Sequence, residues 1–185
     1  MPPHKPNSAT ELIHANLRLL HQIRALLCGI DSVCFTTPSP VLLDSAIGGH
    51  VRHCLDHYSC LLAGLMGGRV DYDQRERNTA VEKDLTAALA KLGEVEVKLS
   101  ELSDRDCSMH LEVKMDHGAA DGDCRWEGSS LGRELQFLIS HTVHHQALMS
   151  GLCHLHGMEK VPDAGFAPST LRYKLAAAHN STAGE

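Results

Sequence analysis

Aromatic residues are scarce in this sequence: only 4% of its 185 residues are Phe, Trp or Tyr, so aliphatic side chains must fill any core. Excess positive charge is also missing, because the formal net charge is −6, which argues against a nucleic-acid partner. No apolar stretch approaches the ~20 residues that cross a bilayer, and the N-terminus lacks the apolar segment of a signal peptide. These absences predict a soluble, cytoplasmic protein without a membrane partner, and the length predicts one domain over residues 1–185.

Paired cysteine motifs are absent as well. The seven cysteines are an odd number and include no Cys-x-x-Cys pair, so reduced thiols fit better than a disulfide framework. The His-Glu-x-x-His motif of zinc proteases is also missing. The sequence therefore gives no sign of a secreted disulfide scaffold or of a protease of that type.

Histidine, in contrast, is abundant and clustered. The chain has 14 histidines, and two short runs of helix-forming sequence, 50–57 and 141–145, are rich in them. Residues i and i+4 share a helix face, so His141 and His145 can direct their rings to one point. Imidazole is the commonest protein ligand for divalent transition metals near neutral pH. The pattern predicts a metal-binding protein.

Apolar residues at helical spacing predict four long helices. They cover about 9–29, 46–66, 80–102 and 131–156. Residues 31–43 are broken by Pro38 and Pro40 and predict an extended crossover between the first two. Four helices around one core predict an all-α fold, a four-helix bundle with a long crossover after helix 1.

Two further segments complete the predicted architecture. Alternation of apolar and polar residues over 109–115, with a turn region and the short segment 124–127, predicts a small β-hairpin before the last long helix. The core of the single domain is expected over about 8–156, followed by a C-terminal loop and short helix over 157–180.

A helical wheel leaves the choice of ligands open. His50 and His57 lie at the edge of the apolar stripe of the second helix, and the wheel favours either of them over His53. His144 turns away from the stripe that includes His145. The alternative to a metal site is a bundle whose polar edges carry solvated or hydrogen-bonded histidines. A metal site requires that the two histidine helices face each other.

Two motifs of this chain resemble those of the DinB family of metalloenzymes. The segment 45–53 (SAIGGHVRH) is similar to the family's helix 2 motif, and 141–146 (HTVHHQ) is similar to its helix 4 motif. The resemblance covers roughly residues 8–156 and implies a four-helix bundle in which His53, His141 and His145 hold one metal ion. This disagrees with the wheel over His53, and we follow the motif.

The resemblance leaves other residues without a fixed role. His57, one turn after His53, is predicted as a catalytic base beside the metal, with a further ligand or a packed side chain as alternatives. Residues 70–77 (VDYDQRER) and 166–173 (FAPSTLRY) are also similar to a subgroup of the family, with no role implied for either.

Three neutral imidazoles leave a divalent ion with open positions, as in catalytic zinc sites. Zinc or nickel is expected, with iron or manganese as alternatives. The resemblance implies an enzyme, a transferase or isomerase that activates a low-molecular-weight thiol as its small-molecule partner and that forms a homodimer. Arg52, Arg75 or Arg77 could hold an anionic substrate, or they could be solvated surface charges.

Other functions are compatible with the same histidines. One is metal-dependent hydrolysis, with bound water as nucleophile. Another is a non-enzymatic, stress-related metal-binding protein, which requires a fourth protein ligand such as His57 or Cys54. A hemerythrin-like di-iron site would need bridging carboxylates, for which Glu134 is the only candidate near either histidine run.

Overall fold

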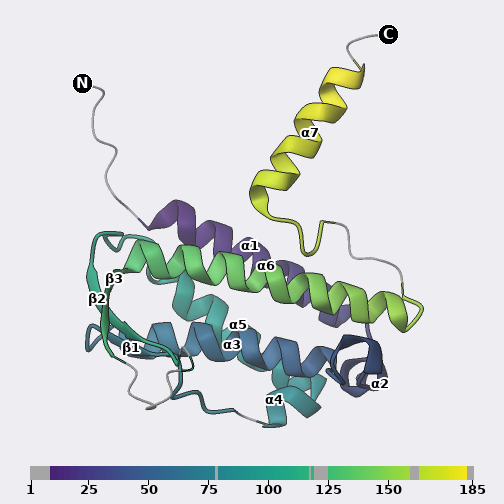
Figure 1. Ribbon diagram of the computed structural model, residues 1–185, viewed down its shortest axis with the longest axis horizontal. Coiled ribbons are helices and arrows are strands. Elements are labelled where there is room, and N and C mark those ends of the chain that lie inside the picture. The colour runs from purple at the N-terminus through teal and green to yellow at the C-terminus, as the bar shows by residue number, and fades with distance from the viewer. Residues whose placement is uncertain (1–8, 78, 117, 119–124, 159–162, 183–185) are drawn as a thin grey trace.

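A computed structural model of the protein describes residues 9–77, 79–116, 118, 125–158 and 163–182 (Figure 1). The described chain is mostly helical and carries one small sheet. The long helices are α1 (Thr10–Cys28), α3 (Ile47–Gly64), α5 (Leu85–Ser100) and α6 (Leu131–Leu155). The predicted predominance of helix is confirmed, and the helices predicted over 9–29, 46–66 and 131–156 are present within two residues of their expected bounds.

These four helices pack around a common aliphatic core. Helix α1 contacts α5 and α6, and α3 contacts the same two helices. Fully buried Leu, Ile and Val side chains from all four helices form one cluster, with Tyr58 and Phe35 as its largest members. Helices α3 and α6 run in opposite directions side by side (Figure 1), which brings the two histidine runs onto facing surfaces.

The sheet closes one end of the helices. Strand β2 (His110–Lys114) pairs antiparallel with β3 (Glu127–Ser130), so a strand pair precedes the last long helix as predicted. The second strand lies at 127–130 and not at the predicted 124–127, of which residue 124 lies outside the described residues. A third strand, β1 (Arg69–Asp71), pairs parallel with β2 and makes the sheet mixed. Strand β1 follows α3, and β3 leads directly into α6, where the Ser130 side chain accepts a hydrogen bond from the Arg133 backbone N–H. The sheet thus ties together the ends of the two histidine helices.

Two predicted segments differ from the structure. The crossover 31–43 is not fully extended: it contains a short helix α2 (Ser32–Thr36) and a 3-10 turn η1 (Pro40–Leu42). The helix predicted over 80–102 is divided into α4 (Thr79–Lys83) and α5. The reason for the division is Asp84, whose carboxylate accepts a hydrogen bond from the Thr86 N–H and so caps a new helix.

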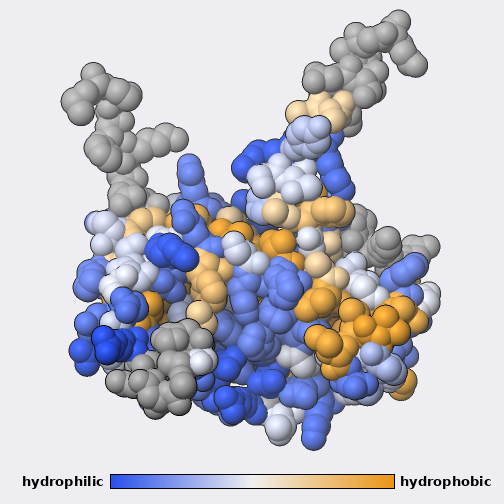
Figure 2. Space-filling view, viewed as in Figure 1, coloured by the Kyte–Doolittle hydropathy of each residue, from blue (hydrophilic) through white to orange (hydrophobic). Residues whose placement is uncertain are grey.

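The last helix, α7 (Pro168–Thr182), projects away from the packed helices (Figure 1). It begins at a proline, which suits the first turn of a helix. Exposed apolar side chains gather around α2 and the end of α6 (Figure 2), among them Val33, Val41 and Leu155. None of the helices in the described ranges has the length and apolar character needed to cross a membrane.

Candidate metal centre

Helices α3 and α6 bring the two histidine runs together across their interface. One nitrogen from each of His53, His141 and His145 lies within 4.8 Å of the others. The Nε2 atoms of His53 and His141 are 3.1 Å apart. The ring of His145 lies 4.7 Å from that of His53 and 4.6 Å from that of His141, measured between centroids. The three residues that the family motif selects therefore share one point in space.

The remaining histidines of the two runs lie around this triad. His50 lies on the side of His145, with 3.1 Å between the two Nδ1 atoms, and its Nε2 is 2.9 Å from the Ser45 hydroxyl. His57 lies on the other side, with its ring centroid 4.1 Å from that of His141. His144 is exposed. Among the described histidines its ring contacts only the ring of His145, in an edge-on arrangement. His50 and His57, which the helical wheel favoured as ligands, thus lie beside the triad and not within it.

The three rings are held neutral by their surroundings. Burial disfavours the charged imidazolium, and neighbouring histidines add to the effect, so the pKa falls to about 3 for His53, about 2 for His141 and about 4 for His145. At pH 7 each ring therefore offers an unprotonated nitrogen. Neutral imidazole is the form that binds a transition metal.

The hydrogen bonds among these rings do not close into a satisfied network. The Arg75 Nη1 is 3.1 Å from His53 Nδ1, and a guanidinium can only donate, so this nitrogen of His53 accepts. The neutral His53 ring then carries its proton on Nε2 and donates to His141 Nε2. The proton of His141 is left on Nδ1, which is buried without a partner. A purely structural cluster would normally satisfy such a group.

The donor set fits a divalent transition metal. The group consists of three neutral nitrogens with no carboxylate, which suits zinc, nickel or iron better than magnesium or calcium. Three protein ligands are the number found in catalytic zinc sites, which keep a position for water or substrate. The described residues thus form a site that can hold a metal ion, and which metal it takes stays a prediction.

His57 is fixed in one orientation by its neighbours. Its Nδ1 lies 2.8 Å from the His53 carbonyl oxygen and donates to it, so the neutral ring has its free lone pair on Nε2. The ring stacks on Tyr72 at 5.5 Å and is only 4% exposed. Burial, the main cause, lowers the pKa of His57 below its ordinary value. Its predicted catalytic role remains a prediction.

Glu134 and Cys54, the other candidate ligands, are not available to a metal ion. Both carboxylate oxygens of Glu134 accept hydrogen bonds, one from the Tyr72 hydroxyl at 2.7 Å and one from Ser129. Glu134 is therefore a partner of the sheet end and does not bridge the histidines. Cys54 is fully buried, and burial raises the pKa of its thiol, which disfavours a thiolate ligand. The described group includes neither residue.

Sequence reasoning did not anticipate two aromatic residues at the site. Tyr72 stacks on His57, and Phe137 stacks on His141 with ring centroids 5.6 Å apart. Phe137 lies four residues before His141 on the same helix face, so helical spacing could have indicated it. Tyr72 comes from the segment 70–77, and only the strand pairing of β1 brings it to α3 and α6.

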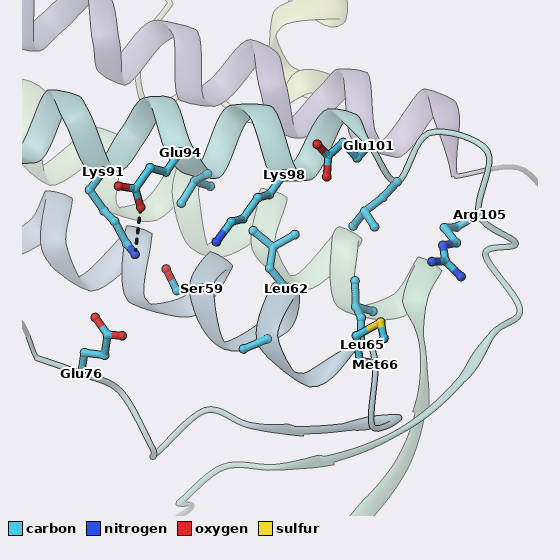
Figure 3. Close-up of a pocket in the computed structure, with 13 residues that line it drawn as sticks. Ser59, Leu62, Leu65, Met66, Glu76, Lys91, Glu94, Lys98, Glu101 and Arg105 are labelled. Atoms are coloured by element: carbon cyan, nitrogen blue, oxygen red, sulfur yellow. Dashed lines mark ion pairs between the residues drawn. The ribbon is translucent and has the colours of Figure 1, made fainter.

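A separate cavity of about 610 Å³ lies between α3 and α5 (Figure 3). Leu62, Leu65 and Met66 form its apolar side, and Lys91 and Glu94 form an ion pair of 3.5 Å at its rim. No histidine or cysteine lines it. Because it offers neither an imidazole ligand nor a thiol nucleophile, the histidine cluster is the stronger candidate site.

Comparisons with known proteins leave the family open. No family model matches the chain, and no solved structure matches it. A curated protein, FK506-binding protein 5 of Rhizopus delemar, is 31% identical over 104 residues, which are 56% of this chain and 27% of that protein. The chain therefore spans about a quarter of the length of this relative. An alignment that covers so little of the relative establishes a local similarity and no common function.

Proposed function

We propose that this chain is a metal-dependent enzyme of the DinB type, a four-helix bundle in which His53, His141 and His145 hold one divalent ion. The observation that carries the proposal is the convergence of three neutral imidazoles from two facing helices. The long crossover between α1 and α3 and the order of the two motifs support the same assignment. Zinc or nickel suits the donors, with iron or manganese as alternatives.

The proposed reaction is transfer or isomerisation that depends on a low-molecular-weight thiol. A divalent ion with three neutral ligands supplies a Lewis-acid position at which a thiol becomes acidic near neutral pH. No carboxylate in the described group offsets the positive charge there. The site would therefore stabilise an anionic ligand, and a thiolate is one such species.

In this proposal His57 accepts the thiol proton at Nε2. The hydrogen bond from Nδ1 to the His53 carbonyl keeps the lone pair on Nε2, and the lowered pKa keeps the ring unprotonated at pH 7. The thiolate sulfur then forms a bond to an electrophilic carbon, and the leaving group departs with its bonding electrons. His57 returns the proton to that leaving group. Tyr72 and Phe137 pack on the rings and limit the access of water.

Metal analysis of matched variants tests the proposal. The parent, His53→Ala and His57→Ala are purified without a histidine tag or a nickel column, and their metal content is measured by elemental analysis. We expect about one ion per chain in the parent and in His57→Ala, and none in His53→Ala. Equal metal content in His53→Ala, or no binding by the parent after addition of zinc, nickel, iron or manganese, would remove the basis of the proposal.

A further inference from the structure

Arg75 reaches the histidine triad from a segment that the sheet holds in place. Strand β1 ends at Asp71, the Tyr72 backbone N–H donates to the Lys114 carbonyl at 2.9 Å, and the Tyr72 hydroxyl donates to Glu134. From this anchored segment, Arg75 extends to His53, where its Nη1 donates to Nδ1 at 3.1 Å. The position of the guanidinium is thus fixed by the fold next to the proposed metal ligands.

The guanidinium of Arg75 forms no close ion pair with a carboxylate among the described residues. Its Nε is buried and makes no hydrogen bond. The carboxylates in its neighbourhood have other partners: Asp56 and Glu82 are both paired with Arg52, at 3.0 and 2.8 Å. Asp73 accepts a hydrogen bond from the Asp116 backbone N–H at 2.6 Å. Arg75 therefore keeps a buried N–H donor without an acceptor.

Its two neighbouring arginines differ in this respect. Arg52 is saturated by two carboxylates, and Arg77 is exposed to solvent. Arg75 alone of the three combines partial burial, contact with a triad histidine and an unused donor. The Nε side of a guanidinium is one of the two edges that bind a carboxylate through paired N–H donors. A buried donor without an acceptor is unfavourable until such a group arrives.

Metal binding would also free the Nη1 donor of Arg75 from its hydrogen bond to His53. Whichever nitrogen of His53 takes the ion, Nδ1 then holds either the ion or the proton of the neutral ring. In neither case can Nδ1 accept the hydrogen bond from Arg75 Nη1. Loading of the triad therefore releases a second donor of Arg75 next to His53.

We propose that Arg75 is a substrate-binding residue that takes the carboxylate of the thiol substrate, so that the substrate class is a low-molecular-weight thiol that also carries a carboxylate. This inference rests on the proposed function of the triad. It gives a role to the segment 70–77, which the sequence motif marks and the metal ligands leave unused. A neutral thiol would reach the same triad but would leave the buried Nε–H of Arg75 without an acceptor.

Matched thiols test the role of Arg75. Thioglycolate and 2-mercaptoethanol carry a thiol, and only the first carries a carboxylate. Their Kd values are measured on cobalt-loaded protein from the sulfur-to-cobalt charge-transfer band. We expect thioglycolate to bind the parent about tenfold or more tightly than 2-mercaptoethanol, as for a charge-assisted hydrogen bond. Arg75→Gln should lose this preference, whereas Arg77→Gln, the exposed control, should keep it.

A second measurement distinguishes a failure of the role of Arg75 from a failure of the proposed thiol function, and it does not require a folded variant. The Nε–H resonance of Arg75 is followed by NMR in the parent, with and without zinc, during addition of acetate or thioglycolate. A shift with both anions and none with 2-mercaptoethanol supports the inference, even if no charge-transfer band forms and the proposed function fails. Equal affinities of the two thiols, with an unmoved Nε–H resonance, would overturn the role of Arg75 and leave the thiol site standing.

Discussion

Two polar clusters lie where α3 meets α6, the first of them joined by Asn16 of α1, and they differ in whether every polar side chain has a hydrogen-bond partner. In one, the Tyr58 hydroxyl donates to Asn16 at 2.8 Å and lies 3.1 Å from the Thr142 hydroxyl. The Asn16 amide in turn donates to the Leu12 and Leu135 carbonyls. Every one of these polar side chains is buried and has a partner. This cluster is complete within the protein.

The histidine cluster, on the same turns of α3 and α6, is not complete. Its rings meet nitrogen to nitrogen, His141 retains a buried nitrogen without a partner, and Arg75 retains an unused donor. Buried polar groups are normally satisfied, and exceptions are concentrated at functional sites. The difference indicates that the first cluster specifies how the helices pack, whereas the second is arranged for a ligand.

The largest expected difference between the clusters is the response to metal. Binding of an ion to the folded state alone raises the free energy of unfolding by about 4 kcal/mol at a thousandfold excess over Kd. Urea unfolding with saturating zinc and with chelator measures this increment. We expect the increment to vanish in His141→Gln and to remain in Tyr58→Phe. An unchanged increment in His141→Gln would show that the ion binds elsewhere.

Removal of a member of the complete cluster should destabilise the fold whether or not metal is present. Asn16→Ala leaves the Tyr58 hydroxyl and two backbone carbonyls without their buried partner. We expect a loss of about 2–3 kcal/mol in the free energy of unfolding, equal with zinc and with chelator. A loss that depends on zinc would mean that the two clusters are coupled.

The pH dependence of the metal-free protein separates the clusters further. The triad histidines have folded pKa values of about 2 to 4, below the ordinary value of about 6.5 in the unfolded chain. The unfolded state therefore takes up protons first, and stability present above pH 6.5 is lost as the pH falls toward 4. The effect is small near pH 7 and grows on acidification. His145→Ala should flatten the unfolding profile, and Tyr58→Phe should leave its slope unchanged.

Much of this arrangement could be predicted from the sequence. Apolar periodicity identified the four long helices, because each buries one stripe on a shared core. The spacing of His141 and His145 placed both rings on one face. The choice of His53 over His57 needed the resemblance, since a wheel treats the helix alone and does not include the neighbouring strand segment that covers His57 through Tyr72.

Other features depend on contacts that local sequence does not encode. Strand β1 forms only because β2 offers a parallel partner, and periodicity over three residues cannot indicate this. The division of the helix at Asp84 required a choice between continuing the helix and capping a new one. The orphaned donor of Arg75 depends on which carboxylates Arg52 has already taken, and that pairing exists only in the folded chain.

The smallest expected effect belongs to His144, which tests how sharply the cluster is bounded. His144 follows the same run and lies 5.0 Å from His145 between ring centroids, yet it is exposed and outside the group whose nitrogens converge. His144→Ala should therefore keep the parent's metal content, with a Kd for zinc within about twofold, because an exposed ring outside the converging group contributes no ligand. Competition with a zinc-sensitive dye measures both values. Loss of metal would mean that α6 provides His141 and His144, and not His141 and His145, as its pair of ligands. The face of α6 that carries the ligands would then be rotated relative to the one seen in this structure, and the comparison with the Tyr58 cluster would have to be drawn for that face.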